Sequence, residues 1–275
     1  MRRLGGVLAG VVLAAGSLGV VGVAPAGTAT TGSGTGCPAT AYVTNYYDNS
    51  VSTIDVATRT KTPNDITVGR FPLGVAITPD GTTAFITNSD ENTVSTIGTA
   101  TRTKNPNDIA VPEQPTRVAI TPDGTTAFVT NFGDGPPSPN SVSTIDVATR
   151  TKTPNDIAVG GHPYGVGITP DGATAFVTNG MDNSVSTIDV ATRTKNPNDI
   201  AVGLSPQQVA ITPDGTTAYV VNTDSNSVST IDVATRTKNP NDITVGMKPY
   251  GVAITPDGTT AYVTNKGSDL SLIHI

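Results

Sequence analysis

His, Glu and Cys, which commonly carry acid–base, nucleophilic or metal chemistry, are scarce in this 275-residue chain. The histidines are His162 and His274, the glutamates are Glu91 and Glu113, and the single cysteine is Cys37. A hydrolase needs a nucleophile beside a base, or a metal ion held by clustered ligands. Isolated residues in separate loops supply neither arrangement, so the sequence predicts no catalytic residues, no metal site and no cofactor.

The chain is richer in aspartate, but most of its aspartates recur at fixed intervals, which indicates a structural repeat. The string Thr-Pro-Asp-Gly (TPDG) occurs at spacings of 43, 48, 43 and 43 residues, and the long interval contains one insertion, Gly135–Pro139. The copies begin at Thr78, Thr121, Thr169, Thr212 and Thr255. The chain is therefore built from copies of one module.

The sequence of each module predicts four short antiparallel strands. In the copy spanning 206–246, the segments 208–212, 217–222 and 226–233 carry β-branched and aromatic residues, and a short fourth strand is expected at 243–245. Four such strands per unit of 40 to 45 residues make one blade of a β-propeller, so the expected fold class is all-β. A helical solenoid is excluded because no apolar pattern of period 3.6 is long enough. A parallel β-helix usually has a shorter period.

The strings inside the module carry a family resemblance. Ala-Tyr-Val-Thr-Asn occurs at 41–45 and 261–265, Ala-Phe-Val-Thr-Asn occurs at 127–131 and 175–179, and Val-Ser-Thr-Ile-Asp follows three of these four. With the Gly-Val-Ala-Ile-Thr-Pro-Asp-Gly string, the chain resembles the YVTN-type β-propeller repeat family of surface-layer-like exported proteins, which is related to lactonase-like seven-bladed propellers. The resemblance implies the fold and is weakly informative about function.

The module count predicts five to six blades in this chain. It enters at a second strand, 41–45, passes through four full copies and stops in a third strand near Ile275. A seven-bladed ring, which the resemblance implies, needs more strands, so we expect a longer complete protein. Residues 270–275 break the repeat pattern and match the translation of a transposon end sequence used in sequencing libraries. We expect them to be a non-native tail, with a genuine truncated strand as the alternative.

The other boundaries follow from composition. Residues 1–26 combine Arg2 and Arg3, a charge-free apolar run and a small-residue cleavage pattern, which predicts a signal peptide; an uncleaved anchor is the alternative. Residues 27–38 are rich in Gly, Thr and Ser and predict a flexible linker. The propeller is expected at 39–269. The protein is therefore expected to be secreted or envelope-associated, with no membrane span after cleavage.

The charge balance disfavours one class of partner. The formal net charge is -6, and loss of Arg2 and Arg3 with the signal peptide would make it -8. Nucleic-acid-binding domains are basic, so no nucleic-acid partner is expected.

One face of the propeller is expected to be nearly constant between copies. It would carry the TPDG turns and the Ala-Thr-Arg-Thr-Lys-x-Pro-Asn-Asp segments. A residue repeated in every blade meets a turn requirement first, so these charges are interpreted as structural, with a polyanion-binding rim as the alternative. The basic residues are Arg59, Arg102, Arg150, Arg193 and Arg236, with Lys61, Lys104, Lys152, Lys195 and Lys238.

The opposite face, which we call the variable face, is expected to carry loops that differ in almost every copy. Loops on a rigid scaffold commonly bind ligands, and aromatic residues and arginine anchor interfaces. Neutral drift of unconstrained loops is the alternative. The candidate binding residues are Tyr46, Tyr47, Arg70, Phe71, Glu91, Glu113, Arg117, Phe132, His162, Tyr164, Gln207, Lys248 and Tyr250.

These observations favour a non-catalytic binding or structural module with an unknown protein or cell-envelope ligand as its partner. A lactonase-like hydrolase on the same fold is the first alternative, and a surface-layer coat component is the second.

Overall fold

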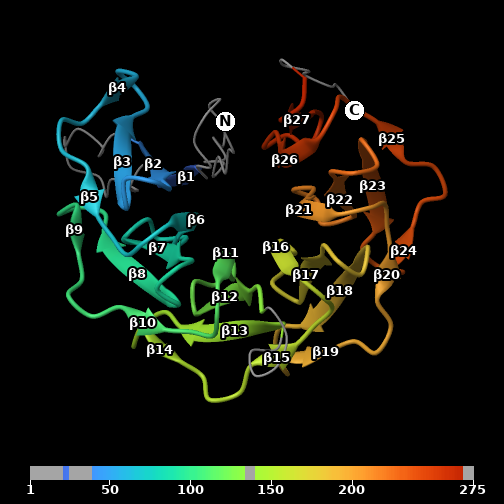
Figure 1. The fold of residues 1–275 in the computed structure, drawn as a ribbon, viewed down its shortest axis with the longest axis horizontal. Coiled ribbons are helices and arrows are strands. Elements are labelled where there is room, and N and C mark those ends of the chain that lie inside the picture. Colours follow the sequence, from blue (N-terminus) through green and yellow to red (C-terminus); the bar gives the residue numbers. More distant parts are fainter. Residues whose placement is uncertain (1–20, 25–38, 134–139, 269–275) are drawn as a thin grey trace, which may run out of the picture.

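The computed structural model describes residues 21–24, 39–133 and 140–268. These residues form five five-stranded antiparallel sheets and one two-stranded sheet, arranged as blades around a common axis (Figure 1). The second to fifth sheets each contain one full copy of the module, so the fold is the all-β propeller that the repeat predicts. The prediction for 270–275 lies outside the described residues.

The strands occupy equivalent places in successive sheets, from the axis outward (Figure 1). The first strands, nearest the axis, are β6 (Pro72–Ile77), β11 (Pro115–Ile120), β16 (Pro163–Ile168), β21 (Pro206–Ile211) and β26 (Pro249–Ile254). The second strands are β2 (Thr40–Asn45), β7 (Thr83–Asn88), β12 (Thr126–Asn131), β17 (Thr174–Asn179), β22 (Thr217–Asn222) and β27 (Ala261–Asn265). The third strands are β3 (Ser50–Asp55), β8 (Thr93–Gly98), β13 (Ser141–Asp146), β18 (Ser184–Asp189) and β23 (Ser227–Asp232).

The outermost strand differs from the prediction because it is present in two pieces. In the fifth sheet, β24 (Thr237–Lys238) and β25 (Ile243–Thr244) both pair with β23, and the intervening Asn-Pro-Asn-Asp segment lies along the outer edge. Proline has no N–H for the ladder and so divides the strand. The other pieces are β4 (Thr60–Lys61) with β5 (Ile66–Thr67), β9 (Thr103–Lys104) with β10 (Ile109–Ala110), β14 (Thr151–Lys152) with β15 (Ile157–Ala158), and β19 (Thr194–Lys195) with β20 (Ile200–Ala201).

The first sheet also differs from the expectation that it would lack a first strand. β1 (Val21–Ala24) pairs antiparallel with β2, in the place that β6 takes beside β7 in the next sheet. These residues belong to the segment predicted as a signal peptide, and the signal peptide stays a prediction.

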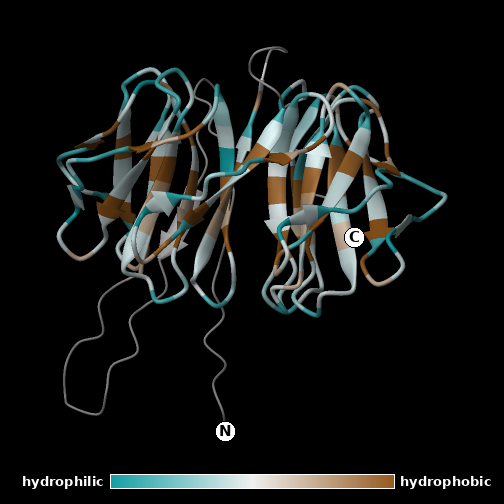
Figure 2. Cartoon of the chain, turned by 90° about the horizontal axis from the view of Figure 1, so that it is seen from below, coloured by the Kyte–Doolittle hydropathy of each residue, from teal (hydrophilic) through white to brown (hydrophobic). Residues whose placement is uncertain are grey.

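The hydrophobic core consists of layers between consecutive blades. Each second strand sends an aromatic side chain into the next sheet: Phe85, Phe128 and Phe176 are fully buried in this way. Burying such a side chain contributes about 1.5–3 kcal/mol. Figure 2 shows the apolar residues as bands across the strands, with polar loops at both faces. Among the described clusters, each joins two consecutive sheets and none joins the first sheet to the last.

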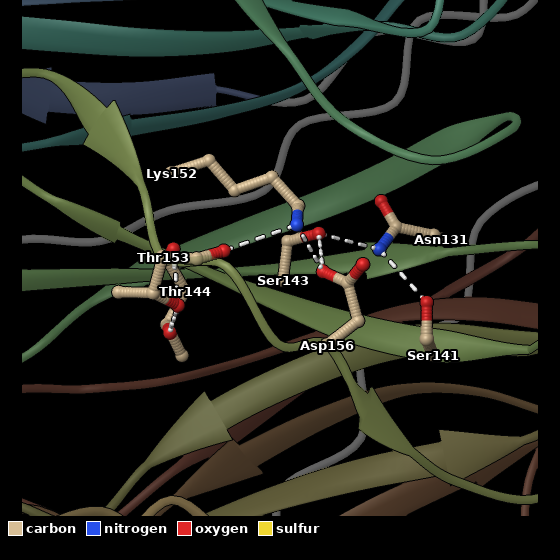
Figure 3. Close-up of polar contacts among 7 residues, drawn as sticks. All are labelled: Asn131, Ser141, Ser143, Thr144, Lys152, Thr153 and Asp156. Carbon is tan, nitrogen blue, oxygen red and sulfur yellow. Dashed lines mark hydrogen bonds and ion pairs between the residues drawn. The ribbon is translucent and has the colours of Figure 1, made fainter.

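In the third sheet, a chain of polar side chains connects the second, third and outermost strands (Figure 3). Asn131 Nδ2 donates to Ser141 Oγ at 3.2 Å and to Ser143 Oγ at 2.9 Å. Ser143 Oγ donates to Asp156 Oδ1 at 2.6 Å, and Asp156 pairs with Lys152. The Lys–Asp pair recurs in five blades at 2.7–2.9 Å, at the outer edge and away from the TPDG turns. We call this arrangement the blade network.

The constant face is held by two kinds of turn. In the TPDG turn, Asp80 Oδ1 accepts the Thr78 hydroxyl at 2.5 Å and the Thr82 N–H at 3.0 Å. These bonds, the Thr78 hydroxyl first, lower the pKa of Asp80. In the turn after each third strand, the arginine has a φ of 54–58°, a left-handed conformation that favours glycine. The arginines predicted for this face therefore do occupy its turns.

Candidate binding face

The variable face has loops of different sequence on one backbone frame. In five blades an asparagine Oδ1 accepts the backbone N–H of the residue that precedes the first-strand proline. The pairs are Asn49 with Phe71, Asn92 with Gln114, Asn140 with His162, Asn183 with Ser205, and Asn226 with Lys248, at 2.8–3.0 Å. The residue that donates its N–H in each pair has a φ of 51–53°, which is uncommon for any residue but glycine. The frame therefore presents a different side chain from the same backbone position in every blade.

A bulge at the start of each first strand places two further residues beside the axis. In β11 the register shifts between Pro115 and Val118, so Thr116 and Arg117 lie in the bulge. A bulge bends its strand and redirects side chains. The equivalent bulges of β16 and β26 place Tyr164 and Tyr250.

The threonine of the Tyr-Val-Thr-Asn string fixes each bulge to the next blade. Thr130 Oγ1 accepts the Arg117 N–H at 3.0 Å and donates to the Tyr164 carbonyl oxygen at 2.8 Å. Thr178 repeats both bonds, with Gly165 and Gln207. The threonine of this string thus connects neighbouring blades, a role that the sequence pattern did not reveal.

Three candidate residues meet near the axis and form what we call the axial cluster. The Arg117 guanidinium lies over the Tyr164 ring, with Cζ 4.6 Å from the ring centroid, and Nη2 donates to the Tyr164 hydroxyl at 3.1 Å. The hydroxyl groups of Tyr164 and Tyr250 contact each other, and their rings are edge to face at 5.8 Å. Burial, followed by the neighbouring Tyr164, raises the pKa of Tyr250. Residues from three sheets therefore converge at one point.

Three other candidates form an aromatic cluster between the first and second sheets. Tyr46 and Phe71 stack with centroids 4.7 Å apart, and Tyr47 meets both rings edge-on. Arg70 lies 5.8 Å from the Phe71 centroid and pairs with Asp90 at 3.0 Å. Tyr47 is 71 % exposed, so this cluster offers apolar surface to a ligand. Burial first, and then Tyr47, Asp90 and Tyr164, raise the pKa of Tyr46.

The remaining candidates do not join these two clusters. Phe132 stacks on His162 with centroids 4.1 Å apart, and Lys248 pairs with Asp224. The other three are Glu91, Glu113 and Gln207, whose side chains make no hydrogen bond or ion pair with another described residue. The candidate residues therefore divide into several separate groups.

Two acidic residues that the candidate set omitted take part in this face. Asp90 pairs with Arg70, and Asp224 accepts hydrogen bonds from both Lys248 and the Ser205 hydroxyl. Both follow a second strand at the same distance. The sequence could have shown these two residues, because an aspartate recurs at that position in modules with an adjacent connection that carries a basic residue, Arg70 or Lys248.

The constant face contains a cavity of about 660 Å³ between the second and third sheets, bounded in part by Asp80, Asp123 and Arg150. Two carboxylates beside one guanidinium do not favour a polyanion there.

Across 39–133 and 140–268, His, Cys, Asp and Glu form no group of three that could hold a metal ion. Within the described part of the chain, no helix is long and apolar enough to cross a membrane.

Comparison with known proteins supports the fold. No family model matches the chain, and no curated protein matches it. Among solved structures, it is similar to Kuenenia stuttgartiensis hydrazine synthase, with 25% identity, a TM-score of 0.73, and coverage of 83% of this chain and 71% of that chain. It is also similar to a functionally unknown protein from Desulfotomaculum acetoxidans DSM 771, with 21% identity, a TM-score of 0.72, and coverage of 82% and 72%. The repeated sheets and these neighbours together show a β-propeller.

Proposed function

We propose that this chain is an exported propeller of the YVTN type whose variable face binds a ligand without catalysing a reaction. The observation that carries the proposal is the repeated backbone frame, which presents side chains that change from blade to blade. A rigid scaffold with varied loop side chains is how many proteins build binding sites. The expected partner is a protein or another component of the cell envelope, and the expected location is outside the cell or in the envelope.

The aromatic cluster supports this proposal because of its composition and exposure. Tyrosine and phenylalanine supply large contact area at low cost in conformational entropy, and they are enriched at interfaces. The stacking of Tyr46 on Phe71 holds the rings in place before a ligand arrives. Pre-organised groups lose less entropy on binding, so they contribute more to affinity.

A sedimentation assay with envelope fragments of the producing cells tests the proposal. The double variant Tyr47→Ala with Phe71→Ala should leave the full chain folded and reduce the fraction that sediments with the fragments. Val56→Ala is the matched control, because Val56 is 45 % exposed in a turn of the constant face. Equal sedimentation of wild type and double variant would contradict binding by this face.

The lactonase-like hydrolase and the surface-layer coat component stay as alternatives. A screen of the full chain with lactones and divalent metals tests the first. Ordered self-assembly of the purified chain tests the second.

A further inference from the structure

Arg117 departs from the repeat at a position where the structure leaves little space. Three other first strands have glycine there: Gly74, Gly165 and Gly251. A Cβ at Gly74 would lie 2.9 Å from Arg117 Cα in the next blade, and one at Gly165 would lie 3.0 Å from Gln208 Cα. Adjacent first strands approach closely at this level, so glycine is the residue that the packing favours. A long charged side chain in this place calls for a reason beyond packing.

The charge of Arg117 is buried without an acidic partner. Arg117 is 8 % exposed, and no described carboxylate lies within ion-pair distance of it. Its guanidinium donates to the Thr116 carbonyl oxygen and the Tyr164 hydroxyl and also lies against the Tyr250 hydroxyl, while its Nε has no partner. Removing a guanidinium from water without a counter-charge is costly. No acidic side chain among the described residues therefore compensates this positive charge.

Tyr250 cannot supply a negative charge to Arg117 at neutral pH. Burial and the adjacent Tyr164 raise the pKa of Tyr250, so its phenol stays protonated. A neutral phenol is, however, a hydrogen-bond donor. The cluster therefore combines one cation with hydroxyl donors, a set that suits an anionic oxygen.

The cluster also lies on the face that varies between blades. The first strands begin at this face, and Arg117, Tyr164 and Tyr250 occupy their first three positions.

We propose that the axial cluster binds a carboxylate group of the ligand, with Arg117 as the counter-charge and the hydroxyl groups of Tyr164 and Tyr250 as hydrogen-bond donors. This inference rests on the proposed binding function and names the chemical class of its ligand. A carboxylate fits better than a phosphate, because one negative charge neutralises one guanidinium, whereas a phosphate dianion would leave a buried excess charge.

Calorimetric titration of the full chain with galacturonate tests the proposal, with galactose as the probe that differs in its lack of a carboxylate. Wild type should bind galacturonate and not galactose. Arg117→Gly should weaken binding on the order of tenfold to a hundredfold, the usual effect of losing a charge-assisted bond. This variant should fold, because glycine occupies the equivalent position in other blades. Arg59→Gln, which removes an exposed arginine from a turn of the constant face, should bind like wild type.

Three results would overturn the inference: no heat from galacturonate with wild type, equal affinity of wild type and Arg117→Gly, or binding of inorganic phosphate in preference to galacturonate. A large loss of thermal stability in ligand-free Arg117→Gly would also overturn it, since it would give the arginine a structural role. The envelope assay is separate: equal sedimentation of the Tyr47→Ala, Phe71→Ala variant refutes the proposed function and leaves the galacturonate result unchanged.

Discussion

The blade network and the axial cluster are both built from partly or fully buried polar side chains, yet they follow opposite rules. In all five five-stranded sheets an asparagine donates to two Ser or Thr hydroxyl groups and a lysine pairs with an aspartate, and these bonds stay within one sheet. The axial cluster occurs once and draws Arg117, Tyr164 and Tyr250 from three sheets. Repetition therefore accompanies the groups that hold a blade together, whereas the proposed carboxylate site rests on residues that the repeat does not share.

The largest expected effect comes from breaking the network. Asn131→Ala should lower the free energy of unfolding by about 3 kcal/mol, because it removes two buried hydrogen bonds and leaves a cavity. Urea denaturation of the full chain measures the loss, with Asn64→Ala on the exposed outer edge as the control. A change below about 0.5 kcal/mol would show that the network is not structural.

A smaller effect is expected for the threonine that connects blades. Thr178→Val should cost about 1 kcal/mol, since the Gly165 N–H and the Gln207 carbonyl oxygen would lose their partner. The fifth sheet provides the reverse experiment, because Val221 stands where the other second strands have threonine. Val221→Thr should not destabilise the chain, and a gain of roughly 0.5 kcal/mol is expected. The role of this threonine in connecting blades would be refuted if Thr178→Val stabilised the chain and Val221→Thr destabilised it.

As the pH falls, protonation of the turn aspartates should lower the stability of the fold before the axial cluster is affected. The Thr255 hydroxyl, with the Thr259 N–H, lowers the pKa of Asp257 from 3.8 to about 2, and Asp80, Asp123, Asp171 and Asp214 shift in the same direction. A group with a lowered folded-state pKa stabilises the fold above its unfolded value and loses that contribution as pH falls through the folded value. Stability should therefore decline between about pH 4 and pH 2. Chemical denaturation as a function of pH would contradict this if stability stayed constant or rose over that interval.

The smallest effect on stability is expected in the axial cluster. Tyr250→Phe removes a hydroxyl that contacts Tyr164 and Arg117, both of which keep other hydrogen bonds, so the free energy of unfolding should change by less than about 0.5 kcal/mol. The same variant should remove the phenol that titrates at the highest pH in an absorbance titration. A destabilisation as large as that of Asn131→Ala would remove the distinction between the two regions.

The module, its four strands and its Pro-Asp-Gly turn could be predicted from the sequence because each depends on local residue types. The division of the outermost strand was missed, although the proline that causes it was visible. The convergence of Tyr250 on Arg117 could not be predicted, because it depends on the angle between blades and joins residues far apart in the chain. The candidate residues were found by variation alone, which identifies a face but does not say which residues on it touch.

The uniformity of the interfaces between blades also bears on how such a gene can change. Phe85, Phe128 and Phe176 pack into the following sheet in the same way. A blade inserted or deleted among these sheets would therefore form the same kind of interface with the blade on either side. Unequal recombination between near-identical coding repeats would then yield folded products of different length. A ligand site made from one unusual copy, such as the one containing Arg117, could be gained, moved or deleted in a single genetic event.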